Sequence, residues 1–179
     1  MSSLIADIFS DRPLIRLARA AQLFRTGDDV RLMFLVAEGQ VLLRRHSRQG
    51  LQLVLQRASS GSVLAEASAY SETYHCDAVA DADSTLRALP VAAFRSRLAA
   101  DATLSQAWAA YLAHEVQAAR MRAEIRSLNT VAERLDFWLG TNGALPERGQ
   151  WQGLAGELGV SREAVYRELA KRRAAAERR

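Results

Sequence analysis

The sequence predicts an α+β fold. We expect an N-terminal sandwich or barrel of short strands, similar to a jelly roll, with flanking helices, then a long helix and a C-terminal helix-turn-helix. Three observations predict it. Short apolar segments recur at a spacing of about ten residues from residue 32 to residue 89, which is typical of an all-β sandwich or barrel. Residues 101–127 lack glycine and proline, and residues 151–171 place a glycine between two helical patterns.

The N-terminal strand domain is predicted from apolar segments separated by turn sequences such as TGDD and SSG, a pattern that favours a sandwich or barrel. The segments expected to form strands are 32–37, 40–45, 51–56, 62–65, 76–80 and 84–89. Before Phe24, apolar residues at helical spacing, from Leu14 to Ala21, predict one or two short helices interrupted near Pro13.

After Pro90 the apolar period becomes helical, which predicts helices over 91–98 and 101–127. The second would be about 40 Å long at 1.5 Å per residue, more than a small β domain covers. We therefore expect its apolar stripe to meet a second copy of the chain, although it could also pack along its own β domain. The stripe consists of Leu104, Trp108, Tyr111, Leu112, Val116 and Ala119.

A further helix should begin at a capping box formed by Thr130 and Glu133 and end at Gly140. Residues 141–150 are rich in turn formers and predict a connection without a fold of its own.

Residues 151–171 have the pattern of a helix-turn-helix. Leu154 and Leu158 supply the apolar side of a first helix, and Ala155 keeps the side chain small where a second helix would cross. Gly159 suits the tight turn, and Ser161 is a good N-cap for the second helix. Val165 and Leu169, four residues apart, should face the core.

The outward face of the second helix carries the predicted binding chemistry. Arginine can donate two hydrogen bonds to guanine, and glutamate can accept one from the cytosine amino group. Residues 160–179 hold seven basic and three acidic residues, which accounts for the whole net charge of +4 and favours a polyanion partner. Lys171, Arg172 and Arg173 would extend this charge along a phosphate backbone. The predicted DNA-binding residues are Ser161, Arg162, Glu163, Tyr166, Arg167 and Lys171.

Several classes of protein are not predicted. No apolar run has the roughly 20 residues that a membrane helix needs, and the N-terminus does not resemble a signal peptide, so we expect a cytoplasmic protein without membrane contact. The single cysteine, Cys76, excludes an internal disulfide. His75 and Cys76 are adjacent and would point to opposite faces of a strand, which disfavours a metal site. No enzyme motif is present, and we expect neither catalytic activity nor a cofactor.

SREAVYR (161–167) closely resembles the recognition-helix motif of CRP-like bacterial transcription regulators in the CRP/FNR family. FRTGDDVRLMFLVAEGQVLL and GSVLAEASAY are similar to the family's first strand pair and pocket segment. The resemblance implies a cyclic-nucleotide-binding-like β-roll over 1–100, a dimerisation helix over 101–128 and a DNA-binding helix-turn-helix over 129–179. It also implies that Arg162, Glu163 and Arg167 contact bases, with TGTGA-like half-sites about one helical turn apart.

Departures from the family concern the effector pocket. Where cyclic-AMP-binding members have an Arg-Ser pair that holds the phosphate, this chain has Cys76 and Asp77, and Ala65 replaces a glycine. A carboxylate beside the phosphate would repel it, so we do not expect ordinary cyclic AMP to control the protein. The chain also ends soon after the recognition helix, so we expect no C-terminal wing. The candidate pocket residues are Leu64, Ala65, Glu66, Ala67, Cys76 and Asp77.

Two functions from different classes follow. The first is a homodimeric, sequence-specific regulator of transcription that binds double-stranded DNA, with RNA polymerase and an unidentified small-molecule effector as further partners. The alternative is a β-roll protein that binds a small molecule or senses redox state or metal, in which the helix-turn-helix serves as a protein interaction surface. Substitution of Arg162 should separate them.

Overall fold

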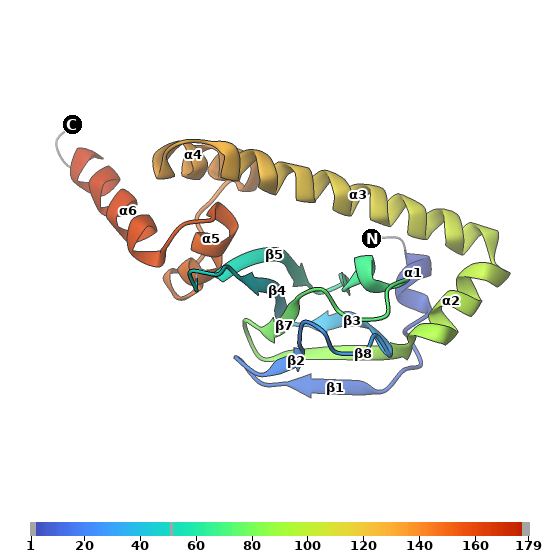
Figure 1. Ribbon diagram of the computed structural model, residues 1–179. Helices are drawn as coiled ribbons and strands as arrows, with labels where there is room; N and C mark the ends of the chain where they lie inside the picture. Colours follow the sequence, from blue (N-terminus) through green and yellow to red (C-terminus); the bar gives the residue numbers. More distant parts are fainter. Residues whose placement is uncertain (1–2, 51, 177–179) are drawn as a thin grey trace. The chain divides into compact units, whose positions relative to one another are not determined.

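The computed structural model describes residues 3–50 and 52–176, and the chain divides into two compact units (Figure 1). The first unit comprises residues 1–45 and 55–117. The second comprises residues 46–54 and 118–179. Arg178 and Arg179, part of the basic segment noted above, lie outside the described residues.

The strands form two antiparallel four-stranded sheets, as the α+β prediction required. One sheet has the order β1-β8-β3-β6 and the other β2-β7-β4-β5. The six strands predicted between residues 32 and 89 are confirmed, and most of their described ends lie within one or two residues of the predicted ends. The predicted start of one strand, Leu51, lies outside the described residues. The strand bounds are β1 Leu14–Leu17, β2 Gln22–Phe24, β3 Leu32–Glu38, β4 Gln40–His46, β5 Gln52–Ser59, β6 Val63–Leu64, β7 Asp77–Ala80 and β8 Ser84–Pro90.

Of the one or two short helices predicted before Phe24, one is present as α1, Ser3–Asp7. The helical prediction from Leu14 to Ala21 is wrong, because Leu14–Leu17 forms β1. This strand pairs with β8, with Leu14 opposite Arg87 and Leu17 opposite Ser84. Pairing with a neighbouring strand thus overrides the local helical spacing, as often happens for short apolar segments.

Aromatic packing fills the core of the first unit. Phe24 stacks on Tyr74 with ring centroids 3.8 Å apart, and the Tyr74 hydroxyl donates to the Leu32 carbonyl at 2.6 Å. Burial raises the pKa of Tyr74 to about 12. A second cluster joins Phe94 and Trp108, whose rings meet edge to face at 4.9 Å. The β-roll is therefore held by two apolar clusters.

The two helices after Pro90 are confirmed as α2, Val91–Ala100, and α3, Ala102–Ser127. Asp101 separates them, because its Oδ1 accepts from the Thr103 and Leu104 amides at 2.9 and 3.0 Å and so caps α3. The predicted stripe is divided: Leu104 and Trp108 are buried in the first unit, whereas Val116 is 49% exposed. Within the described residues, no helix is both long enough and apolar enough to cross a membrane.

In the second unit, α4 spans Val131–Asn142 and begins at the predicted capping box of Thr130 and Glu133. The predicted end at Gly140 is wrong, because the helix continues for two residues. The residue that ends it is Gly143, with φ of 80°, and its amide donates to the Leu139 carbonyl at 2.7 Å. A short 3₁₀ turn, η2 at Arg148–Gln150, follows.

Two helices complete the second unit, α5 at Trp151–Leu158 and α6 at Arg162–Ala176. They share a small apolar core with α4 and the end of α3. The buried residues of this core are Ile125, Leu135, Trp138, Trp151, Leu154, Ala155, Leu158, Val165 and Leu169.

Candidate nucleic-acid interface and effector pocket

The turn between α5 and α6 has the geometry expected from its residues. Gly159 adopts φ of 66°, in the left-handed region that glycine enters without steric cost. The Val160 amide donates to the Ala155 carbonyl at 3.0 Å, and Ala155 is 1% exposed. Val165 and Leu169 of α6 are buried, as their spacing predicted. This packing fixes which side of α6 faces outward.

Two arginines that the sequence pattern did not indicate hold the end of α5. Arg134 donates from Nη1 to the Leu158 carbonyl at 3.0 Å and from Nε to the Leu128 carbonyl at 2.8 Å. Arg126 donates from Nε to the Glu157 carbonyl at 3.2 Å. Carbonyls at a helix C-terminus have no partner within the helix, so these cations satisfy them and complement the helix dipole.

Burial lowers the pKa of Arg126, and repulsion from nearby Arg122 and Arg134 acts in the same direction. A half-buried arginine bonded to backbone carbonyls has a structural task. The only sequence signal for such a task would have been arginines on α3 and α4 at helical spacing from the turn, which is too general to identify them.

The first turn of α6 is capped by Ser161. Its Oγ accepts from the Ala164 amide at 3.2 Å, which is the predicted N-cap bond. Hydrogen bonds from the backbone amide of Glu163 and from the Ser161 hydroxyl lower the pKa of the exposed Glu163 carboxyl. Glu163 is therefore ionised at neutral pH, in the form that accepts hydrogen bonds.

Arg162 folds back along α6. Its Nη2 donates to the Tyr166 hydroxyl at 3.0 Å, and its guanidinium carbon lies 5.1 Å from the centre of the Tyr166 ring. Tyr166 in turn meets Trp151 edge to face at 4.8 Å. The Tyr166 side chain thus rests on the core of the second unit and holds Arg162 at the surface.

The basic residues further along α6 differ in their surroundings. Arg167 and Lys171 are exposed. Arg172 instead donates to Glu168 at 2.8 Å, to Asp136 at 2.5 Å and to the Ala132 carbonyl at 3.0 Å. It braces α6 against α4 and does not extend the outward positive surface as predicted. Arg173 lies over the Trp151 ring at 5.8 Å.

The candidate effector pocket belongs to the first unit. Leu64 and Ala65 are buried, Glu66 is half-buried at the start of a 3₁₀ turn, and Ala67 is exposed. Ala65 has φ of 56°, where a side chain costs energy and glycine does not. Ala65 thus has a backbone conformation that glycine would adopt without this cost.

Cys76 and Asp77 point in different directions. Cys76 is fully buried in an apolar cluster, and burial raises the pKa of its thiol to about 11. The thiol is therefore protonated at neutral pH, the unreactive form. Asp77 accepts at Oδ1 from the Thr26 amide and hydroxyl at 2.9 and 3.2 Å, so its carboxylate holds the turn before β3.

His75 and Cys76 lie in a bend before β7, so the expected strand geometry does not apply to them, and the His75 Nδ1 lies 3.0 Å from the Ser68 hydroxyl. Burial lowers the pKa of His75, and Arg45 lowers it further. Among the described residues, no three His, Cys, Asp or Glu side chains are grouped as a metal site requires.

The comparisons with known proteins agree with this geometry. Residues 14–101 match the family model of the cyclic nucleotide-binding domain. None of the curated proteins matches the sequence significantly. FixK2 from Bradyrhizobium japonicum is 16% identical with a TM-score of 0.78, covering 92% of this chain and 86% of its own.

The c-di-GMP responsive global regulator CLP from Xanthomonas campestris is 21% identical, with a TM-score of 0.78 over 97% of this chain and 92% of CLP. A CRP-family transcriptional regulator from Thermus thermophilus is 19% identical, with a TM-score of 0.74 over 90% of this chain and 85% of its own. This chain has the same fold as these three proteins. CLP and the Thermus thermophilus protein are described as regulators.

The matched residues include Ala65 and Glu66 together with Cys76 and Asp77, so the candidate effector pocket lies within the region that resembles the cyclic nucleotide-binding domain.

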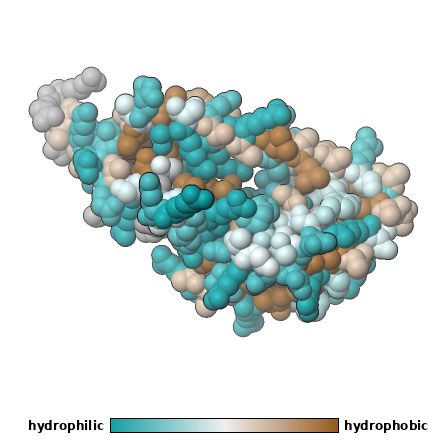
Figure 2. Space-filling model, in the orientation of Figure 1, coloured by the Kyte–Doolittle hydropathy of each residue, from teal (hydrophilic) through white to brown (hydrophobic). Residues whose placement is uncertain are grey.

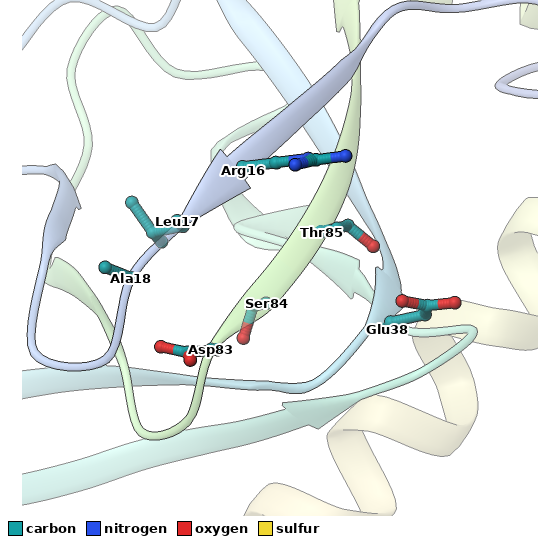
Figure 3. A pocket seen from close by; sticks show the side chains of 7 residues that line it. All are labelled: Arg16, Leu17, Ala18, Glu38, Asp83, Ser84 and Thr85. Atoms are coloured by element: carbon teal, nitrogen blue, oxygen red, sulfur yellow. The ribbon is translucent and has the colours of Figure 1, made fainter.

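A cavity in the first unit is lined by residues other than the candidate effector-pocket residues. Figure 3 shows it between the end of β1, the end of β3 and the start of β8. Its volume is about 470 Å³. Gly39, beside it, has φ of 85°, and a Cβ there would lie 2.4 Å from the Asp83 carbonyl oxygen. The lining residues are Arg16, Leu17, Ala18, Glu38, Asp83, Ser84 and Thr85.

Proposed function

We propose that the protein is a homodimeric, sequence-specific DNA-binding regulator of transcription that works in the cytoplasm. One observation carries the proposal: the outward face of α6, with a capped first turn, presents arginine and glutamate side chains while its other face is fixed in a core. The CRP-family fold supports the same assignment. In functional terms, residues 1–100 form the effector domain, 101–128 the dimerisation helix and 129–179 the DNA-binding domain.

Readout would combine base contacts with backbone contacts. Arg162 and Arg167 would donate to guanine, and the ionised Glu163 would accept from a cytosine amino group. Ser161 and the first-turn amides would position the helix on a phosphate, with Lys171 on the backbone. A TGTGA-like half-site fits these donors and acceptors. Arg162 must exchange its Tyr166 contact for a base, which is a rotamer change and not a refolding.

Dimerisation is proposed through α3. Leu112, Val116 and Ala119 recur at alternating spacings of four and three residues, the repeat of a coiled coil. Val116 is 49% exposed and Met121 is 37% exposed. Figure 2 shows hydrophobic residues among hydrophilic ones along this helix. Two copies joined there would bring two α6 helices to a palindromic site.

Ordinary cyclic AMP is not the proposed effector, because Cys76 supplies no charge to hold a phosphate. CLP is described as responsive to c-di-GMP, which shows that a protein of this fold can respond to a different nucleotide. An unidentified small molecule and RNA polymerase are the further partners that the proposal includes.

The test is selection of DNA sites from a random pool, followed by gel-shift titration against Arg162→Ala. Loss of a bidentate base contact costs about 1–3 kcal/mol, which corresponds to roughly 5- to 150-fold weaker binding. Arg19→Ala, which removes the same charge from an exposed loop of the first unit, is the matched control and should bind as the wild type does. If the wild type selects no sequence over random competitor, the helix pair is a protein interaction surface instead.

A further inference from the structure

The end of the β4–β5 hairpin, residues 46–54, belongs to the second unit together with α5 and α6. Val54 is fully buried, and its side chain lies against Gly156 in the middle of α5. A Cβ built on Gly156 would lie 2.4 Å from Val54 Cγ2 and 3.3 Å from Val54 Cβ. Only glycine leaves room for Val54 at this point of the helix.

This contact gives Gly156 a reason to be there. Glycine destabilises the interior of a helix, and Gly156 has an ordinary helical φ, so no turn requires it. Gly140, inside α4, offers a comparison, because a Cβ there would meet nothing within 4 Å. The nearest atoms to a Cβ on Gly156 all belong to Val54. The glycine therefore accommodates the hairpin.

Arg126 ties the same two segments together. Its Nη2 donates to the Val54 carbonyl and, at 3.1 Å, to the Gly156 carbonyl. Its Nε donates to the Glu157 carbonyl. One guanidinium thus connects the base of the hairpin to the last turn of α5. Packing and hydrogen bonding are combined at one place, as in a specific docking contact.

The tip of the hairpin lies beside the first turn of α6. The two segments line a cavity of about 330 Å³. His46, Gly50 and Gln52 form the hairpin side of that cavity. Val160, Ser161, Arg162 and Glu163 form the other side. A recognition helix meets DNA through its N-terminal residues, and here those residues line one side of this cavity while the hairpin lines the other.

We propose that the β4–β5 hairpin docks on α5 at Gly156 and competes with DNA for the first turn of α6. The inference rests on the proposed function, because the competing partner is the duplex that α6 reads. With the hairpin docked, the tip residues occupy the approach of the DNA backbone. Release of the hairpin opens that approach. The apparent DNA affinity is therefore proportional to the fraction of molecules in which the hairpin is released.

A disulfide provides the first test. Val54 and Gly156 would have Cβ atoms 3.3 Å apart, close to the 3.5–4.5 Å typical of disulfides, so Val54→Cys with Gly156→Cys should cross-link the docked state. Cys76→Ala in the same protein leaves a single possible pair. We expect the oxidised protein to bind its selected DNA site at least about tenfold more weakly than the same protein after reduction. Each single-cysteine variant, treated identically, is the control.

Steric release provides the second test. Gly156→Ala should weaken docking and raise DNA affinity by up to about tenfold, because overpacking a tight contact shifts an equilibrium by that order. Gly140→Ala, also a glycine inside a helix, is the matched control and should leave the affinity unchanged. Adding Val54→Ala to Gly156→Ala removes the methyl group that clashes, and should return the affinity toward that of the wild type.

The outcomes separate the two proposals. Failure of the cysteine pair to cross-link under oxidation would overturn docking. Cross-linking with equal DNA affinity before and after reduction would overturn competition, while the proposed function stands. If the wild type and every variant, reduced or oxidised, select no DNA sequence, the proposed function and the competition fall together.

Discussion

The α5–α6 turn and the candidate effector pocket segment both contain a residue with a left-handed backbone, but they differ in the groups that surround it. At the turn, the backbone and its side-chain partners agree: Gly159 occupies the left-handed region and Arg134 bonds the carbonyl of Leu158. In the pocket segment, Ala65 holds a left-handed conformation that suits glycine, and Cys76 is buried among apolar residues. The comparison teaches that hydrogen-bonding partners can support a left-handed backbone at one place in a fold, while elsewhere a residue with a side chain adopts the same conformation at an energetic cost.

Arg134→Met tests the turn with the largest expected effect. It removes hydrogen bonds from a charged donor and leaves the Leu158 and Leu128 carbonyls without that partner, so we expect a loss of about 2–3 kcal/mol in the free energy of unfolding. Urea denaturation measures it. Arg134→Lys retains the charge but not the forked geometry and should lose less. Equal stability of the Met variant and the wild type would show that the brace is dispensable.

The next largest effect is expected in the pocket segment, where the Cys76 thiol should make the stability of the protein depend on pH. Burial raises the pKa of Cys76 to about 11, above the value of 9.0 for a free thiol, so the folded state binds the proton more tightly than the unfolded state. Stability from this group is fully present below about pH 9 and is lost as the pH rises to about 11, by on the order of 1–2 kcal/mol.

Unfolding curves between pH 8 and 11 measure this dependence. Cys76→Ala should flatten the curve in that window, while titration of the tyrosines affects both proteins alike. Rapid labelling of native Cys76 by a thiol reagent at pH 7 would contradict the assignment and favour the redox-sensing alternative.

Ala65→Gly should stabilise the protein by about 0.5 kcal/mol. Removing the strain of a left-handed alanine raises the free energy of unfolding by about 1 kcal/mol. The greater conformational freedom of glycine in the unfolded chain offsets about half of this gain. Thermal unfolding detects the difference. Ala67→Gly, two residues later without a positive φ, should instead destabilise. A loss of stability in Ala65→Gly would mean that the alanine methyl contributes packing that outweighs its strain.

The smallest expected effect is that of cyclic AMP, which should leave the melting temperature of the protein unchanged. A ligand at 100 times its dissociation constant stabilises the folded state by about 2.7 kcal/mol, enough to move a melting temperature by several degrees. We expect no shift in melting temperature with millimolar cyclic AMP. A shift would show that the pocket holds the phosphate through groups other than those at positions 76 and 77.

Much of the fold could be predicted because its signals are local. Six strands follow from alternating apolar segments, and α3 from a long run without helix breakers. β1 could not be predicted in this way, because its partner β8 is about 70 residues away and the spacing of Leu14 and Leu17 also fits a helix. Gly140 misled for a related reason: an exposed glycine is tolerated inside a helix, and the stop came from Gly143.

The candidate interface was predictable for residues whose role depends on their own helix. Ser161 as N-cap and Val165 in the core follow from position alone. The roles of Arg126, Arg172 and Gly156 depend on partners distant in the sequence, so spacing gave no sign of them. For Asp77 the sequence located the position but not the direction of the side chain, which bonds the turn at Thr26.

The engagement of Arg172 by Glu168 and Asp136 affects how strongly the ionic environment would govern DNA binding. DNA affinity falls with salt in proportion to the number of phosphates that a protein neutralises, with a slope of about −0.9 per phosphate. A cation already paired with two carboxylates releases few counterions from the duplex. Each protomer would then depend more on base contacts than on bulk attraction, so discrimination between sites should survive at ionic strengths that remove nonspecific association.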